Sequence, residues 1–246
     1  MRVVVGSGLG SGGMVLQACL NGDHETGVPR SPAELAEAAR ACVAAGAVSL
    51  HAHPRDREGH ESLDPRDIAA AVVAMREAAP GIEISFSTGL WITGGDVDVR
   101  ARMISEWTAT PDLISLNLSE EGWRELADLV TARGIGIEAG VWTARDAEIL
   151  AESGVQVRRV LVEPRTENAD EAVATARDID AALDRVFVRA PRLHHGVGPA
   201  TWAVLDAAVL IGREIRIGLE DVLTLPDGRR APDNAALVVE TVLRYA

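Results

Sequence analysis

Eight short runs of strand character alternate with segments of helical character along the chain. The predicted strands are Val15–Leu20, Val48–His53, Glu83–Ser87, Leu113–Leu116, Gly136–Val141, Arg158–Val162, Arg192–His195 and Arg216–Leu219. This alternation is typical of a parallel sheet whose strands are joined by crossover helices. A chain of 246 residues that is 47% hydrophobic can close one (β/α)₈ barrel and bury a large core. An open doubly wound sheet of about five or six strands is the alternative fold.

Two of the predicted helices have clearly marked first turns. Ser31-Pro32-Ala33-Glu34 is a capping box with proline at the first helical position. Asp64-Pro65-Arg66-Asp67 has the same pattern of a capping residue, a proline and an acidic residue. In the first of these helices Leu35, Ala39, Cys42 and Val43 fall on one face. We expect that face to pack on the barrel.

The first 13 residues are predicted to be a flexible leader, and residues 14–246 a single catalytic barrel. The leader contains Gly8-Leu9-Gly10-Ser11-Gly12-Gly13, a formal match to the dinucleotide-binding fingerprint. That fingerprint must open a helix, whereas the residues that follow have strand character, so we do not expect a nucleotide site. The chain has neither an apolar run of about 20 residues nor a signal-peptide pattern. We therefore expect a cytoplasmic protein without a membrane partner.

The charged residues exclude one class of partner and some kinds of chemistry. With 24 basic and 37 acidic residues the formal net charge is −13, which would repel a nucleic-acid backbone. Every basic residue is arginine, so no lysine can form a Schiff base or a carbamylated ligand. The two cysteines, Cys19 and Cys42, lie in apolar stretches and are predicted to be buried, reduced thiols.

A pair of histidines ends the second predicted strand, at the end of a barrel where active sites lie. Because strand side chains alternate, His51 and His53 point to the same side and can chelate one ion. The alternative is that one histidine is satisfied in the core and the other is incidental. The H-x-H spacing at a strand end favours a divalent metal site.

A third metal ligand is expected from another strand end, and Glu220 after the eighth strand is the best candidate. Asp221 is expected to diverge from Glu220 and could serve as a general base. Arg216 lies four residues before Glu220, so it could hold Asp221 ionised or bind a substrate carboxylate. A solvated pair of Arg216 with Glu220 is the alternative.

Polar residues at other strand ends are candidate substrate contacts. Hydroxyl and amide groups at such positions can bind a substrate, although they often serve only as caps. Glu25 follows the first strand and could bind an amino or hydroxyl group, or belong to an ordinary turn. The full set of candidate contacts is Glu25, Ser87, Thr88, Ser115, Asn117 and Glu138.

Taken together, these motifs resemble the β-keto acid cleavage enzyme family over nearly the whole chain. The resemblance is sharpest at His51-Ala52-His53-Pro54-Arg55-Asp56 and at Arg216-Ile217-Gly218-Leu219-Glu220-Asp221. It extends through Leu20-Asn21-Gly22, Ser87-Thr88-Gly89 and Leu116-Asn117. The resemblance implies a zinc-type ion bound by two histidines and a glutamate, which here are His51, His53 and Glu220.

The resemblance also implies a reaction and its partners. Asp221, supported by Arg216, would remove a methyl proton from acetyl-CoA, and the carbanion would attack the ketone of a β-keto acid. CoA transfer and a retro-Claisen cleavage would then release acetoacetate and a new acyl-CoA. Ser87 and Ser115 match positions that contact substrate in this family. The resemblance further suggests a homo-oligomer, either a tetramer or a dimer.

Two other functions remain open from the residues alone. The chain could be another single-metal barrel enzyme, either a hydrolase that uses metal-bound water or an aldolase-type lyase without CoA. It could also be a barrel that binds a ligand without catalysis. The H-x-H motif by itself does not separate these functions.

Overall fold

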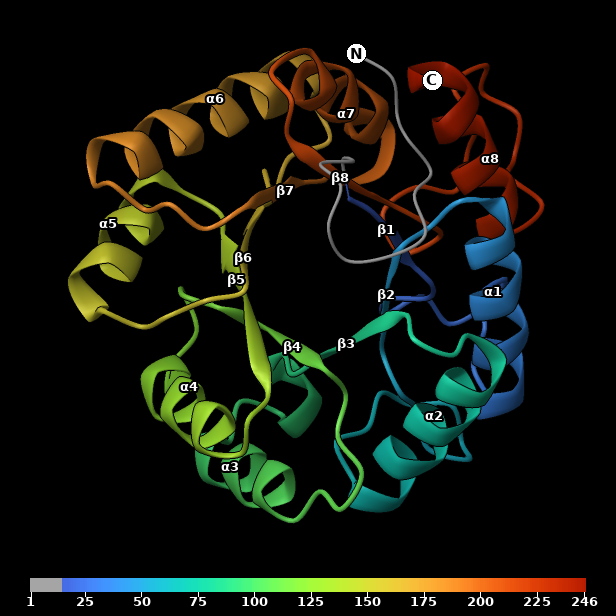
Figure 1. Ribbon diagram of the computed structural model, residues 1–246, viewed down its shortest axis with the longest axis vertical. Coiled ribbons are helices and arrows are strands. Elements are labelled where there is room, and N and C mark those ends of the chain that lie inside the picture. Colours follow the sequence, from blue (N-terminus) through green and yellow to red (C-terminus); the bar gives the residue numbers. More distant parts are fainter. Residues whose placement is uncertain (1–14) are drawn as a thin grey trace.

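The strands pair in sequence order, and the last pairs with the first, so the sheet closes into a barrel (Figure 1). Every one of the pairings is parallel. The computed structural model describes residues 15–246, so the predicted leader over residues 1–13, with its glycine-rich segment, lies outside the described residues. Helices surround the strands as an outer ring (Figure 1). The prediction of a closed (β/α)₈ barrel is confirmed, and the open sheet is excluded.

All eight predicted strands are present. They are β1 (Leu16–Cys19), β2 (Ser49–Ala52), β3 (Glu83–Ser87), β4 (Leu113–Asn117), β5 (Gly136–Val141), β6 (Arg159–Val162), β7 (Arg192–His194) and β8 (Glu214–Ile217). The bounds of β3 and β5 are those predicted, and only β8 is displaced by as much as two residues.

Strand β8 ends earlier than predicted because the chain turns at Gly218. The carbonyl of Gly218 accepts hydrogen bonds from the amides of Asp221 and Val222, both at 3.0 Å. A side chain does not fit at this turn, since a Cβ on Gly218 would lie 1.8 Å from the carbonyl oxygen of Cys19. Glu220 and Asp221 therefore lie in a turn after the strand and not on its extension.

Eight α-helices follow the strands, and the two whose starts were predicted, α1 and α2, begin at the predicted residues. They are α1 (Pro32–Ala45), α2 (Pro65–Ala78), α3 (Val97–Ser105), α4 (Trp123–Ala132), α5 (Ala144–Ser153), α6 (Ala169–Arg185), α7 (Thr201–Leu210) and α8 (Asn234–Tyr245), with short 3₁₀ helices η1 (Leu90–Thr93) and η2 (Gly198–Ala200). Ser31 and Glu34 form the predicted capping box of α1, and Asp64 caps α2. Within residues 15–246 no helix is both long and apolar enough to cross a membrane.

The barrel interior contains a buried polar network as well as an apolar core. Glu138 on β5 is fully buried and accepts hydrogen bonds from Gln17, at 2.8 Å, and from Ser85. The Nε atom of Arg159 lies 3.4 Å from the Glu138 carboxylate. Ser85 in turn lies 3.2 Å from Nδ1 of His51. This network connects the centre of the barrel to the first histidine of the H-x-H motif.

Candidate active site

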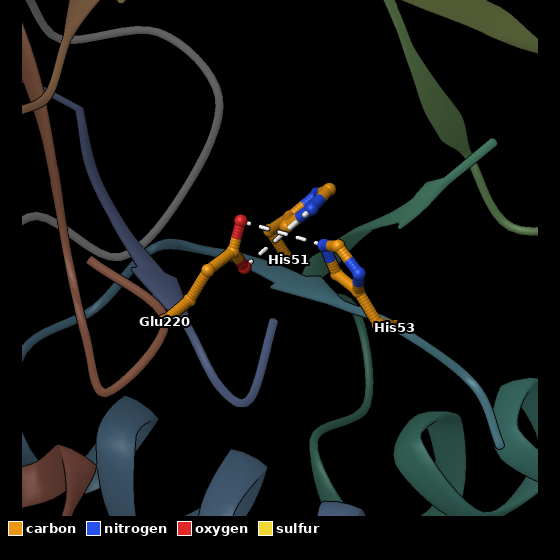
Figure 2. A group of neighbouring side chains, drawn as sticks. All are labelled: His51, His53 and Glu220. Atoms are coloured by element: carbon orange, nitrogen blue, oxygen red, sulfur yellow. Dashed lines mark ion pairs between the residues drawn. The ribbon is translucent and has the colours of Figure 1, made fainter. Parts of the chain in front are cut away.

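The H-x-H motif and the turn after β8 bring three potential metal ligands together. Figure 2 shows the side chains of His51, His53 and Glu220 pointing toward one another. Nε2 of His51 lies 3.7 Å from Oε2 of Glu220, and Nε2 of His53 lies 3.4 Å from Oε1. One ligand atom from each residue lies within 4.8 Å of the other two. Closure of the barrel is what brings β2 and β8 near each other, on either side of β1.

Both imidazole rings are held from the side that faces away from Glu220. Nδ1 of His51 lies 3.2 Å from the hydroxyl of Ser85, and Nδ1 of His53 contacts the carboxylate of Glu61. A partner on Nδ1 fixes the orientation of a metal-binding histidine and leaves Nε2 free to bind the ion. The rings are therefore oriented for a ligand at the position between them and Glu220.

A divalent cation fits these three side chains. Oε2 of Glu220 is buried and has no hydrogen-bond partner within residues 15–246. Burial lowers the pKa of His51 to about 3, so this imidazole is neutral, as a ligand must be. Burial also acts to lower the pKa of His53, but Glu220 and Glu61 outweigh it and raise that pKa to about 9. A positive charge is thus favoured beside Glu220, and two imidazoles with one carboxylate are donors typical of catalytic zinc sites.

Arg216 on β8 contacts both carboxylates of the following turn. Its Nη2 atom lies 2.8 Å from Oε1 of Glu220 and 2.8 Å from Oδ1 of Asp221. Strand alternation predicted that the two acidic side chains would diverge; both reach Arg216 because they lie on the turn. Only Glu220 belongs to the group of three potential ligands. Despite burial, which raises it, the pKa of Glu220 is held well below its usual range by Arg216 and the two histidines.

Asp221 is buried among three other groups. Its Oδ2 accepts a hydrogen bond from Sγ of Cys19, at 3.0 Å, and lies 3.3 Å from Nε of Arg216. Nδ1 of His195 lies 3.3 Å from its Oδ1. Burial raises the pKa of Asp221, but Arg216 and His195 outweigh it and lower the pKa below its usual value. Asp221 is therefore ionised and held by several donors.

A cavity of about 510 Å³ lies at the carboxyl ends of the strands. It is lined by the three potential ligands, by Arg216 and by Asp221. Three of the candidate substrate contacts, Ser87, Ser115 and Asn117, line it. The cavity is also lined by Trp91 on η1, whose ring stacks on that of His53 with centroids 6.4 Å apart. Substrate-sized space thus adjoins the potential ligands and Asp221.

The remaining candidate contacts lie elsewhere. Thr88 is buried, and its hydroxyl donates to the carbonyl of Ser115 at 2.7 Å. Glu138 belongs to the buried network inside the barrel and does not line the cavity. Glu25 lines a neighbouring hollow of about 530 Å³, which shares Asp23 and Trp91 with the first. These residues are therefore placed to support the site or flank it.

Part of the surroundings of Asp221 was not predicted from the sequence. Cys19 is buried, as predicted, but its thiol points at a carboxylate of the site. The sequence did not distinguish His195 from the other polar residues at strand ends. Trp91, which stacks on His53, lies in a segment without strand character and was not predicted to be near the site. Cys19 lies at the end of β1, which pairs with β8 in a closed barrel. That position is the signal from which its contact with Asp221 could have been predicted.

The fold and the site define a parallel (β/α)₈ barrel with a candidate cation site at the carboxyl ends of its strands. The family model described as beta-keto acid cleavage enzyme matches residues 14–245, and the chain belongs to this family. It is 23% identical over 238 residues to a 3-keto-5-aminohexanoate cleavage enzyme of Fusobacterium nucleatum, covering 91% of this chain and 86% of the relative. The resemblance stated from the motifs is confirmed.

Solved structures of ObcA have the same fold. The apo structure superposes with a TM-score of 0.68 at 18% identity, and the binary complex with oxaloacetate with 0.68 at 17%. The ternary complex with a C4-CoA adduct and oxalate gives a TM-score of 0.71 at 18% identity. Each match covers 88% of this chain, which spans only 61–63% of the length of the ObcA chains.

Proposed function

We propose that the protein transfers the acyl group of a β-keto acid to CoA, using acetyl-CoA as co-substrate and releasing acetoacetate. Membership of the beta-keto acid cleavage enzyme family supports this reaction. So does the name of the Fusobacterium relative, which is a keto acid cleavage enzyme. The observation that carries the proposal is the convergence of His51, His53 and Glu220 beside the Asp221–Arg216 pair on one cavity.

The products determine which carbon atom must lose a proton. Acetoacetate contains the acetyl group of the thioester joined to the methylene and carboxylate of the keto acid. The proton must therefore leave that methylene, and not the methyl group of acetyl-CoA as the sequence resemblance implied. The resulting carbanion attacks the thioester carbonyl and expels CoA thiolate. The thiolate then attacks the original ketone, the carbon–carbon bond breaks, and the acetoacetate carbanion takes up a proton.

Asp221 is the residue that we place as the base for the methylene proton. It lines the cavity, and its carboxylate is ionised in spite of burial. Arg216 contacts both oxygens of the carboxylate and so contributes to the orientation in which Asp221 can accept a proton. The hydroxyls of Ser87 and Ser115 and the amide of Asn117 line the same cavity and can bind the polar oxygens of the substrate.

His51, His53 and Glu220 are the residues that would hold a divalent cation, which we propose to be zinc. When bound, such an ion supplies Lewis acidity to the keto and carboxylate oxygens of the substrate. The chain has no lysine, so an imine route to the same cleavage is closed to it.

The proposal is tested by incubating the purified protein with a panel of β-keto acids, each with and without acetyl-CoA. We expect acetoacetate and a new acyl-CoA to form in equal amounts, and only when acetyl-CoA is present. A hydrolase or an aldolase-type lyase would consume a β-keto acid without acetyl-CoA. That result would overturn the proposed acyl transfer while leaving the candidate metal site in place.

A further inference from the structure

We propose that His195 is a positioning residue, which donates a hydrogen bond from Nδ1 to Asp221 and holds the carboxylate in the orientation needed to accept a proton. The inference rests on the proposed function, in which Asp221 is the base. It concerns a residue that does not line the cavity and so acts through Asp221.

The imidazole of His195 lies between two carboxylates. Nδ1 is 3.3 Å from Oδ1 of Asp221, and Nε2 is 3.8 Å from Oε2 of Glu163. The side chain is 1% exposed, and within residues 15–246 neither ring nitrogen makes a hydrogen bond of suitable geometry. An imidazole without such bonds is costly to bury unless its N–H group faces an acceptor.

The fold explains why this histidine points inward. The amide of His195 donates to the carbonyl of Val162, so the residue continues the pairing of β7 with β6. His194, its neighbour, points to the other side and lies 3.2 Å from Asp180 on α6. Alternation along β7 therefore places His195 at the site and His194 against the helix.

Glu163 lies on the far side of the ring. Its carboxylate accepts a hydrogen bond from Nε1 of Trp142 at 3.0 Å and pairs with Arg165. The side chain of Glu163 is thus fixed by two donors of its own, and its Oε2 lies 3.8 Å from Nε2 of His195. The ring is confined between a fixed carboxylate and the proposed base.

Arg216 is not the only group that contacts the carboxylate of Asp221. Arg216 lies along one edge of the carboxylate, with Nη2 and Nε near the two oxygens. His195 approaches Oδ1 in addition, and Cys19 approaches Oδ2. A donor on each oxygen beyond the guanidinium restricts rotation of the carboxylate group. Reactions that depend on such orientation lose rate without losing substrate affinity when it is relaxed.

The test compares His195→Leu with His195→Asn, whose amide can place a donor near the position of Nδ1, and with His194→Asn as the matched control. In the folded proteins, confirmed by circular dichroism, we expect His195→Leu to lower kcat about 10- to 100-fold, the factor for a hydrogen bond to a charged group. KM for the β-keto acid and the bound metal content should stay at wild-type values. His195→Asn should recover part of kcat, and His194→Asn should leave kcat within about twofold of wild type.

A measurement without turnover separates this inference from the proposed function. Nitrogen-15 NMR of labelled histidines should show hydrogen on Nδ1 of His195 in the wild-type protein and a shifted resonance in Asp221→Asn. An Nδ1 without hydrogen, or a His195→Leu variant with wild-type kcat, would overturn the inference. A wild-type protein that turns over no β-keto acid would instead overturn the proposed function, and the NMR result would still decide the role of His195.

Discussion

The guanidinium of Arg216 contacts both carboxylate oxygens of Asp221, with Nη2 2.8 Å from Oδ1 and Nε 3.3 Å from Oδ2. Only arginine can make this side-on contact, because lysine offers a single ammonium group. We predict that Arg216→Lys keeps the charge but lowers kcat about 10- to 100-fold. Steady-state kinetics of the folded variant checks this. Equal kcat in the variant and the wild type would show that the side-on contact is irrelevant to turnover.

Asp221→Asn should lower kcat by the contribution of a general base while the candidate cation site survives. The substitution preserves the shape of the side chain and removes the base, and general-base catalysis typically contributes about 10²–10⁴-fold. The metal content of Asp221→Asn, measured by mass spectrometry, should equal that of the wild type because Asp221 is outside the group of three potential ligands. Retained activity would remove Asp221 from the role of base.

The support of His53 by Glu61 gives a prediction about metal affinity. Glu61 contacts Nδ1 of His53, and loss of such a partner typically lowers metal affinity about 10- to 100-fold. We expect Glu61→Gln to show this loss in a competition titration with a chromophoric chelator. Glu58→Gln, on the same loop and half-exposed, is the matched control and should bind the ion as tightly as the wild type. His51→Ala combined with His53→Ala should bind none.

Acid stability should depend on a cluster outside the site, where Asp180 contacts Arg192 and His194. Burial raises the pKa of Asp180, but His194, Arg192 and Arg213 outweigh it and lower the pKa to about 2. A depressed pKa stabilises the fold above the unfolded value near 3.8, and this contribution is lost as pH falls toward 2. It amounts to at most about 2 kcal/mol.

Asp180→Asn should therefore lower the free energy of unfolding at neutral pH and weaken its dependence on pH between about 4 and 2. Asp184→Asn, which alters the more exposed partner of Arg192, is the control. Its free energy of unfolding should depend on pH as steeply as that of the wild type. Urea titrations across this pH range measure both. An unchanged slope in Asp180→Asn would contradict the assignment of this cluster.

The fold and most of the candidate cation site could be predicted because both depend on local patterns. Alternation of strand and helix signals gave the barrel, and the spacing of His51 and His53 placed them on one side of a strand. The relation of Glu220 to Asp221 could not be predicted in the same way. It depends on the turn at Gly218, which follows the end of β8 and where the Cys19 carbonyl leaves no room for a side chain.

Contacts that depend on closure of the barrel could not be predicted from local sequence patterns either. Cys19 and Asp221 meet because β1 pairs with β8, and nothing in either segment alone indicates the other. The position of Glu138 has the same origin. It lies on a strand as expected, but its partners on β1 and β3 keep it inside the barrel, away from the cavity.

Carbon tracing tests the central claim most directly. The wild-type protein is incubated with an unlabelled β-keto acid and acetyl-CoA that carries carbon-13 in both acetyl carbons. Acyl transfer as proposed predicts that both labelled carbons appear in the acetyl end of acetoacetate and that the new acyl-CoA is unlabelled. Consumption of the keto acid with all of the label remaining in acetyl-CoA would contradict the proposed function.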